Sequence, residues 1–365
     1  MKVLFYFGHP AQYLFLRQTI KRLKDSGNHS AIIVIKTKDV LEDLIKNDGL
    51  DYINILPEVR RKSKFSIIIS LLKRNIRLIP IVLKAKPDLM IGTDASVAHV
   101  GKLLGIKRIT ITEDDYDVIS SLADLTYPFT DVILCPTVCD VGRWNAKKVG
   151  YPGYMKLGYL HPNLFAADSS ILKKYGIAGK FVLIRLAKLT AHHDFGIKGI
   201  SHADLDKFIS ILSENGFMVF ISSEAGIPDR FQPFLLRIDP SDMHHVLAGA
   251  SILISDSQSM SVEAAVLGVP SLRLSDFSGK ISVLEELEHK FSLTFGIKPA
   301  EEERIIARLN ELISMPGLKE EFQKRRKVML SEKIDVSAFL FWFIENYPQS
   351  ITTLNQQPAY IARFR

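Results

Sequence analysis

Short apolar runs alternate with helical patterns through the first 135 residues, and this alternation restricts the fold more than any other feature of the sequence. Strands are predicted at residues 2–7, 31–36, 52–56, 88–92, 108–112 and 131–135. Helices are predicted between them at residues 12–24, 39–46, 65–84 and 96–104. Strands that alternate with helices in this way predict a parallel, doubly wound sheet with right-handed crossovers.

The regular pattern breaks between residues 142 and 175 and then begins again, which predicts two domains. Glycine and proline cluster in this interval, at Gly150, Pro152, Gly153, Gly158 and Pro162. Further strands are predicted at 180–186, 218–222 and 251–254, and helices at 205–214, 241–248, 260–267, 318–331 and 336–347. We therefore expect an α/β protein with two Rossmann-like domains, 1–165 and 170–335, whose strand ends face a central cleft.

The C-terminal end of the chain contains one strongly apolar helix. Residues 336–347 include the run Phe339, Leu340, Phe341, Trp342 and Phe343, which should be buried. We expect this helix to pack back on the first domain. Residues 349–365 are predicted to be a loosely held tail.

Composition limits the class of protein and its compartment. With 365 residues, 47% of them hydrophobic and 24% charged, the chain is a globular protein with material for two cores. Its two cysteines, Cys135 and Cys139, form neither a disulfide framework nor a four-thiolate zinc site. The apolar run after Lys2 is too short for a signal peptide, so we expect a reduced, cytoplasmic protein.

The net charge of +7 is concentrated in residues 60–86, a stretch that has two interpretations. Lysines and arginines are not interleaved with aromatic residues here, so no nucleic-acid partner is expected. Lys73, Arg74 and Arg77 interrupt the apolar pattern of residues 65–84, which excludes a transmembrane helix. The stretch is either a sheet-covering helix with a basic outer face, which we favour, or a peripheral contact with an anionic membrane.

A strand, a polar turn and a helix follow one another in residues 250–278 and form the main candidate binding site. The turn Ser255-Asp256-Ser257-Gln258-Ser259 lies where a parallel strand should end and a helix begin. Free backbone N–H groups and the helix dipole favour an anion there. The alternative is an Asp or Ser helix cap without a ligand. Glu263, one turn into the helix, is placed to bind a hydroxyl pair of a sugar or merely to favour the helix dipole.

Polar residues after the predicted strands of the first domain are candidates for proton transfer. His9 follows the first strand, as an acid or base or as a helix cap. Asp94 follows the fourth strand, and Glu113 to Asp117 follow the fifth. Crowded carboxylates raise one another's pKa, which suits proton transfer at neutral pH. Asp115 and Asp117 also match an Asp-x-Asp metal pattern, but we favour a solvated loop and expect no metal.

Two histidines in the second domain complete the set of candidates. His192 and His193 follow its first strand, where an imidazole can approach a phosphate or a reacting hydroxyl. A second pair, His244 and His245, falls inside the helix that Ser241 should cap, and is interpreted as structural. The sequence has no P-loop, no GxGxxG after the first strand, no GxSxG and no HExxH, which disfavours P-loop kinases, ordinary dehydrogenases and α/β-hydrolases.

The stretch SDSQSMSVEAAVLG, residues 255–268, resembles the nucleotide-sugar site of glycosyltransferase-B-fold proteins. Several longer segments between residues 111 and 296, among them YPGYMKLGYLHPNLF and LTAHHDFGIKGIS, are similar to an uncharacterised microbial family, domain of unknown function 354. The resemblance implies a glycosyltransferase-B-like fold.

A more distant similarity is to the non-hydrolysing UDP-N-acetylglucosamine 2-epimerases. It implies acidic residues at Asp94, Glu113 and Asp117, a histidine at His192 or His193, and diphosphate and ribose contacts at Ser257 and Glu263. The sequence differs from that family at two places. Gln258-Ser259 replaces two glycines, and LTAHHDFG replaces the arginine-rich run after the histidine.

Taken together, the residues and the resemblance predict an enzyme that uses a nucleotide sugar, UDP-linked by the resemblance, without a cofactor. The second domain would bind it through Ser257, Gln258, Ser259 and Glu263. His9, Asp94, Glu113, Asp115, His192 and His193 are the catalytic candidates. Glycosyl transfer to a lipid-linked or glycan acceptor in surface-polysaccharide synthesis, at the inner face of the membrane, is the leading hypothesis. The alternatives are sugar-nucleotide epimerisation and binding without catalysis; the oligomeric state is left open.

Overall fold

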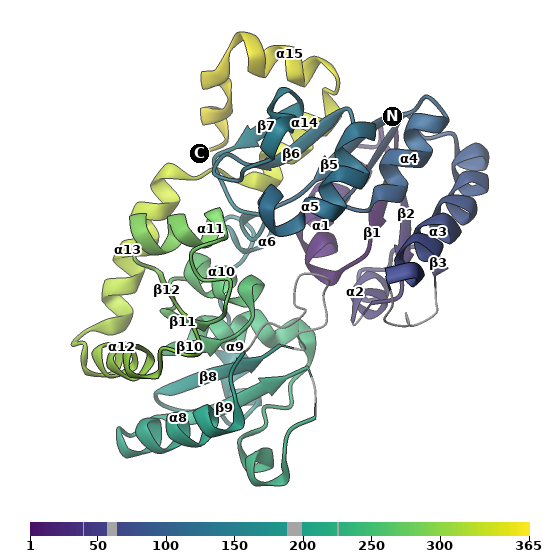
Figure 1. Ribbon diagram of the computed structural model, residues 1–365. Coiled ribbons are helices and arrows are strands. Elements are labelled where there is room, and N and C mark those ends of the chain that lie inside the picture. The colour runs from purple at the N-terminus through teal and green to yellow at the C-terminus, as the bar shows by residue number, and fades with distance from the viewer. Residues whose placement is uncertain (39, 57–63, 188–198, 225) are drawn as a thin grey trace. The chain divides into compact units, whose positions relative to one another are not determined.

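The computed structural model describes residues 1–38, 40–56, 64–187, 199–224 and 226–365. The chain separates into two compact units (Figure 1). The first unit comprises Met1–Tyr159 together with the returning segment Ile334–Arg365, and the second comprises Leu160–Lys333. Each unit is built on its own parallel sheet.

The first unit contains a seven-stranded parallel sheet with the order β3-β2-β1-β4-β5-β6-β7. Its strands are β1 (Lys2–Phe7), β2 (Ser30–Lys36), β3 (Ile53–Leu56), β4 (Leu89–Gly92), β5 (Lys107–Ile111), β6 (Val132–Pro136) and β7 (Lys148–Tyr151). The sequence prediction missed β7, because this edge strand contains Lys148 and Gly150 and is only partly buried, so it shows no apolar run.

Helices on both faces cover this sheet. They are α1 (Pro10–Asp25), α2 (Leu41–Asn47), α3 (Lys64–Ala85), α4 (Ala95–Leu103) and α5 (Tyr116–Thr126). Helices α3, α4 and α5 pack side by side as one layer, whereas α1 packs with α2. Beneath the first layer, Tyr6 of β1, Met90 of β4 and Leu78 of α3 belong to one buried cluster. The short α6 (Leu157–Leu160) lies where the chain passes into the second unit.

The returning segment completes the first unit. Helix α14 (Val336–Glu345) packs on α1, and its Phe339, Leu340 and Phe343 are fully buried. Residues 349–365, expected to be loosely held, form α15 (Gln349–Gln356) and a final 3-10 segment, Pro358–Phe364. Tyr360 of that segment stacks on Trp342 with ring centroids 4.8 Å apart. Aromatic contacts with α14 therefore hold the end of the chain, which the polar composition of residues 349–357 does not reveal.

The second unit contains a five-stranded parallel sheet with the order β12-β11-β10-β8-β9. Its strands are β8 (Phe181–Leu186), β9 (Met218–Ser223), β10 (Ile252–Ser255), β11 (Ser271–Leu274) and β12 (Thr294–Ile297). Its helices are α7 (Ser170–Lys174), α8 (His202–Glu214), α9 (Met243–Gly249), α10 (Gln258–Leu267), α11 (Ser282–Glu285), α12 (Glu302–Ser314) and α13 (Leu318–Glu332).

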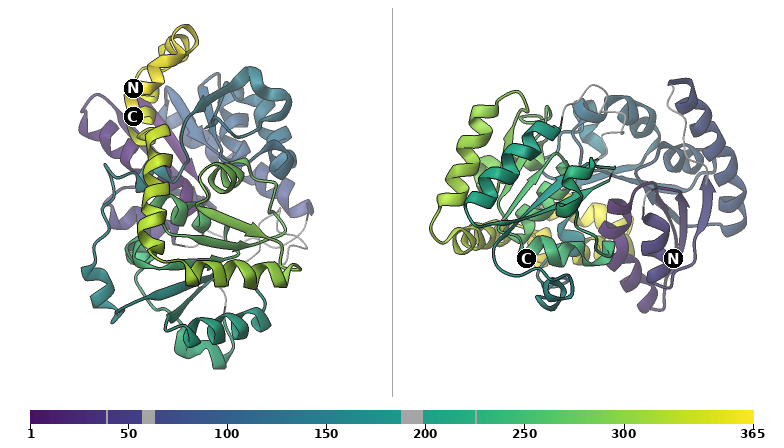
Figure 2. Two further views of the ribbon diagram at one scale, coloured as in Figure 1. Left: turned by 90° about the vertical axis from the view of Figure 1, so that its left-hand side faces the viewer. Right: turned by 90° about the horizontal axis from the view of Figure 1, so that it is seen from below.

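Two helix boundaries in the second unit, the corner between α12 and α13 and the start of α9, are set by single residues. Helices α12 and α13 meet at a sharp corner (Figure 2), where Gly317 has a φ of 64°, a left-handed conformation that glycine adopts without strain. Ser241 does not cap α9, as the sequence had suggested. It lies in a preceding 3-10 turn, where its N–H donates to the Asp239 carboxylate at 2.8 Å, and α9 begins at Met243. None of the helices in the described part of the chain is long and apolar enough to cross a membrane.

Candidate functional site

Each sheet has one point where its strand order reverses, and some of the predicted site residues lie at the ends of the strands beside these points. The reversal lies between β1 and β4 in the first unit and between β8 and β10 in the second. Open α/β sheets bind ligands outside the carboxyl ends of the strands at such a switch point. His9 and Asp94 follow β1 and β4, and the turn 255–259 follows β10.

The turn after β10 is a well-formed helix start. The Ser255 hydroxyl accepts the N–H of Ser257 at 2.8 Å, and the Ser257 hydroxyl accepts the N–H of Met260 at 3.3 Å. Ser257 is therefore the N-cap of α10. The N–H groups of Gln258 and Ser259 find no acceptor among the residues that the structure describes. The turn therefore has a helix cap, Ser257, and also two N–H groups, of Gln258 and Ser259, that an anion could accept. The interpretation as a helix cap and the interpretation as an anion site do not exclude each other.

The loss of this cap gives the first testable prediction. Ser257→Ala removes the side-chain acceptor for the Met260 N–H and should lower the free energy of unfolding by about 1 kcal/mol. Ser257→Gly should cost only a few tenths of a kcal/mol, because glycine is tolerated at an N-cap. Urea denaturation followed by circular dichroism measures both. No loss of stability in Ser257→Ala would show that the Ser257 hydroxyl does not stabilise α10.

The side chain of Gln258 is held by two hydrogen bonds. Its amide nitrogen donates to the Ser275 hydroxyl at 2.7 Å, and its amide oxygen accepts from Arg273 at 2.8 Å. The side chain is thus committed to residues at the end of β11. A glutamine at this position is consistent with a backbone contact to a phosphate, although the related pattern has glycine there.

Arg273 is a buried cation behind the first turn of α10, and the sequence prediction did not single it out. Its side chain is fully buried, and its Nε and Nη2 find no hydrogen-bond acceptor in the described chain. The carboxylates of Glu285 and Glu288 lie 3.9 Å from Nη2. Burial lowers the pKa of Arg273, whereas the two glutamates oppose that shift. An arginine inside the apolar run 271–274 was the available sequence signal.

Asp256, in the turn after β10, accepts two backbone N–H groups from other parts of the second unit. One carboxylate oxygen accepts the N–H of Ala187 at 2.6 Å, and the other accepts the N–H of Ile200 at 3.3 Å. Burial raises the pKa of Asp256, and these backbone N–H groups oppose the rise. The two donors flank residues 188–198, so the predicted candidates His192 and His193 lie outside the described residues.

Glu263 has a partner that the sequence prediction treated as structural. Its carboxylate lies 3.3 Å from Nε2 of His244, which comes from α9, and both side chains are largely buried. The ring of Phe165 contacts His244 edge-on with centroids 6.3 Å apart. His244 is therefore a functional candidate by position, since it is placed to orient the Glu263 carboxylate.

In the first unit, Asp94 is the centre of a charged network. It caps α4, accepting from the N–H and the hydroxyl of Ser96 at 3.0 and 2.7 Å. Nε of Arg74 lies 3.1 Å away and Nζ of Lys36 lies 3.9 Å away. Burial alone would raise the pKa of Asp94, but Lys36, Arg74 and Ser96 together hold it below its ordinary value. The expectation that neighbouring carboxylates raise its pKa is therefore wrong: cations, not acids, surround it.

The acidic loop after β5 is divided between different contacts. Glu113 accepts the N–H of Met155 at 2.5 Å and pairs with Lys156 at 2.8 Å, in a nearly buried arrangement. Asp115 is buried and accepts the N–H of Asp140 at 2.7 Å. Asp117 is exposed in the first turn of α5, so the two aspartates of the Asp-x-Asp pattern have different environments.

His9 takes the capping position that the sequence left open. Its Nδ1 accepts the N–H of Ala11 at 3.2 Å, which makes it the N-cap of α1, and the residue is exposed at the end of β1. Cys135 and Cys139 are free and buried, and burial raises the pKa of Cys135 to about 12.

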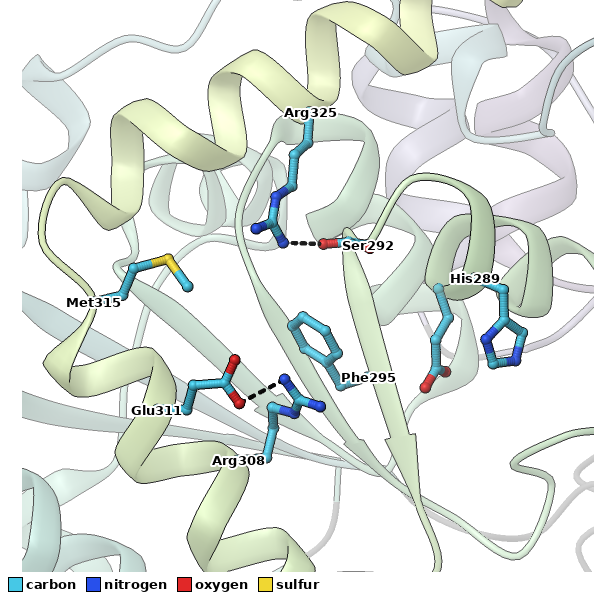
Figure 3. A pocket seen from close by; sticks show the side chains of 8 residues that line it. His289, Ser292, Phe295, Arg308, Glu311, Met315 and Arg325 are labelled. Atoms are coloured by element: carbon cyan, nitrogen blue, oxygen red, sulfur yellow. Dashed lines mark hydrogen bonds and ion pairs between the residues drawn. The ribbon is translucent and has the colours of Figure 1, made fainter.

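A hollow on the second unit lies beside β12 rather than at the carboxyl ends of β8 and β10. It has a volume of about 470 Å³ and is lined by Phe295, Arg308, Glu311 and Arg325, among others (Figure 3). Arg308 pairs with Glu311 at 2.7 Å, and Arg325 donates to the carbonyl of Ser292 at 2.8 Å. Because both cations are already paired, we assign no ligand to this hollow.

Comparison with known proteins identifies the fold. No family model and no curated protein matches the sequence. The S. aureus MnaA–UDP co-structure matches with a TM-score of 0.70 at 14% identity, over 96% of this chain and 98% of that one. UDP-GlcNAc 2-epimerase from Neisseria meningitidis bound to UDP-GlcNAc matches with a TM-score of 0.69 at 15% identity, over 91% and 99%.

A rhamnosyltransferase has a similar structure as well. The spinosyn rhamnosyltransferase SpnG, complexed with the spinosyn aglycone, has a TM-score of 0.61 at 13% identity, over 95% of this chain and 100% of that one. At these identities the likeness is one of fold. The predicted class, two Rossmann-like α/β units of the glycosyltransferase-B type, is confirmed. The narrower resemblance to domain of unknown function 354 stays a prediction.

Proposed function

We propose that this chain is a nucleotide-sugar enzyme and that it acts as a sugar-nucleotide epimerase. The observation that carries the proposal is the turn after β10, where two N–H groups at a helix N-terminus lie at the switch point of a sheet. Support comes from two similar structures that were determined with bound UDP or UDP-GlcNAc. In this proposal the diphosphate binds at Ser257, Gln258 and Ser259, and Glu263 binds the ribose hydroxyls.

The first unit would supply the groups that exchange a proton at the sugar's second carbon. The candidates are His9, Asp94, Glu113 and Asp115, with His192 and His193 from the second unit. His9 is exposed at the end of β1, where its Nδ1 caps α1. The low pKa of Asp94 suits a carboxylate that stays ionised and supports the electrostatics of the site, rather than one that donates a proton.

Glycosyl transfer is the second candidate function, and similar glycosyltransferase structures support it. It would use the same nucleotide-sugar site and add an acceptor, which our sequence hypothesis takes to be a glycan or a lipid-linked sugar. The experiment that separates the two reactions is incubation with UDP-GlcNAc in D₂O without any acceptor. Deuterium in the recovered sugar nucleotide supports epimerisation. Transfer to an added acceptor without such incorporation supports the transferase.

The binding part of the proposal has its own prediction. Glu263→Ala should weaken nucleotide-sugar binding by about 1–3 kcal/mol, because a charged hydrogen-bond acceptor is removed from the hydroxyl pair. Isothermal titration calorimetry measures the loss, and Glu214→Ala, at the C-terminal end of α8, serves as the matched control. Unchanged affinity in Glu263→Ala would remove Glu263 from the site.

Binding without catalysis is the third alternative. Ion pairs that serve stability alone would look the same as those of Glu113 with Lys156 and of Asp94 with Arg74 and Lys36. If nucleotide-sugar binding survives in Asp94→Asn and Glu113→Gln, and the wild type turns over no substrate in D₂O or with acceptors, the chain is a binding protein. A wild type that binds no UDP-, GDP- or CMP-linked compound contradicts all three alternatives.

A further inference from the structure

Helix α3 has two apolar faces, and only one of them is used within the first unit. Leu71, Leu78 and Val82 are buried against the rest of the unit. On the other side, four large side chains are half exposed or more: Ile69 (52%), Leu72 (54%), Ile76 (67%) and Leu83 (55%). Intervals of three, four and seven residues place these four on one side of the helix. They form an exposed apolar row, which we call the α3 row.

Cations flank the α3 row, and α3 itself contains no acidic residue. Lys73, Arg77 and Lys84 are exposed, and their spacing places them on the same side of α3 as the row. The sequence from residue 64 to residue 87 contains no aspartate or glutamate. The remaining arginine, Arg74, is buried and paired with Asp94, so it does not contribute to this surface. The outer face of α3 is therefore apolar and cationic.

The neighbouring helices enlarge the apolar surface of the same layer. Leu103 at the end of α4 is 70% exposed, and Leu122, Leu125 and Phe129 in and after α5 are each about 40% exposed. Eight of the ten exposed large hydrophobic side chains of the described chain thus come from the α3–α5 layer and its connections. Soluble proteins seldom leave a concentration of this kind without a partner.

We propose that the α3 row and its flanking cations bind the surface of an anionic lipid bilayer. Apolar side chains beside lysine and arginine are the combination by which a surface helix inserts among the headgroups of acidic lipids. A second copy of the chain fits less well, because α3 contains no aspartate or glutamate and a two-fold contact between two α3 helices would give Lys73 and Arg77 no carboxylate partner on the facing helix. The surface lies on the outer layer of the first unit and stands independently of the proposed reaction.

Vesicle sedimentation with the full chain tests the proposal. We expect binding to vesicles that contain phosphatidylglycerol and little binding to pure phosphatidylcholine. Raising the salt concentration from about 0.1 M to about 1 M should release the protein, since screening weakens the attraction of the cations. Wild type that stays in the supernatant with anionic vesicles overturns the proposal. So does equal binding to both kinds of vesicle.

Variants of exposed residues locate the contact. Lys73→Gln with Lys84→Gln should weaken binding to anionic vesicles about fivefold for each charge removed. Leu72→Gln with Ile76→Gln should weaken it about tenfold or more. The control is Lys327→Gln with Val328→Gln, an exposed cation and an exposed apolar residue on α13, which should bind like the wild type. Unchanged melting temperatures show that the variants are folded.

A second copy of the chain on the α3 row would give a different experimental result from a lipid surface. If light scattering finds a dimer that Ile76→Gln converts to a monomer, and vesicles do not bind, the α3 row is a self-contact and the lipid proposal is wrong. Loss of vesicle binding in the α3 variants with an unchanged oligomeric state supports the lipid surface. Loss in the α13 control as well would mean that net charge alone, and not the α3 row, drives the binding.

Discussion

Lys156→Met is expected to lower the free energy of unfolding by about 3–5 kcal/mol, the range for removing one partner of a buried ion pair. The Lys156 ammonium lies 2.8 Å from the Glu113 carboxylate, and their side chains are only 5% and 12% exposed. Methionine fills a similar volume but leaves Glu113 with the Met155 N–H and no cation. A carboxylate that loses its counter-charge in this setting either stays ionised at a high cost or takes up a proton.

Urea denaturation measures this effect against two controls. Lys207→Met breaks an ion pair with Glu302 that is about half exposed, and should cost less than about 1 kcal/mol. The double variant Glu113→Gln with Lys156→Met removes both charges and should recover part of the loss, because no charge stays buried alone. A loss of less than 1 kcal/mol in Lys156→Met, or a double variant that is no more stable, would show that the pair carries little of the stability.

The fold could be predicted because buried strands and sheet-covering helices leave periodic patterns. The predicted strands at residues 2–7 and 131–135 correspond to β1 and β6, and the predicted helix at residues 65–84 corresponds to α3. Elements that lack such a pattern were missed. Strand β7 is polar and lies at an edge, and α5 begins inside the acidic run that was interpreted as a loop. A strand or helix whose residues are as polar as those of a loop shows no apolar periodicity and cannot be predicted from it.

The candidate site residues could be selected because they follow predicted strands, whereas the side chains that pair with them could not be predicted. Position after a strand identified Asp94, Glu113 and Ser257 from local sequence alone. Lys156, however, lies 43 residues from Glu113, in the stretch where the pattern breaks. Arg74 belongs to a helix whose cations were taken to face outwards. Contacts between distant segments decide which carboxylate is paired, and a single sequence carries no direct record of them.

The partners of these carboxylates change how the acidic rim, Asp94 after β4 and Glu113 to Asp117 after β5, is understood. From sequence, the carboxylates were expected to crowd one another and so to hold protons near neutral pH. In the structure, cations and backbone N–H groups reach them from other elements, and the pKa of Asp94 lies below its ordinary value instead. The second unit shows the opposite case, because burial raises the pKa of Asp256 despite two N–H donors.

Asp94→Asn is the sharpest test of that rim, because asparagine keeps the helix cap and removes only the charge. Arg74 and Lys36 would lose their common partner, and we expect a loss of about 3–5 kcal/mol near neutral pH. The sign of the pH dependence follows from the lowered pKa. The contribution of the ionised carboxylate is fully present above its ordinary pKa of 3.8 and disappears as the pH falls through the lower value of the folded state.

The difference in stability between wild type and Asp94→Asn should therefore be constant from about pH 7 to pH 5 and shrink only below about pH 4. Thermal or urea unfolding across this range measures it, with Asp168→Asn as the control. Asp168 makes the same kind of contact, accepting the N–H of Ser170 at 2.8 Å, but at an exposed position where no large change is expected. A difference that grows as the pH falls from 7 to 5 would mean that Asp94 titrates with a raised pKa, because a carboxyl with a higher pKa in the folded state stabilises that state as it takes up a proton. In that case the crowding of carboxylates, and not the pairing with Arg74 and Lys36, would govern the rim.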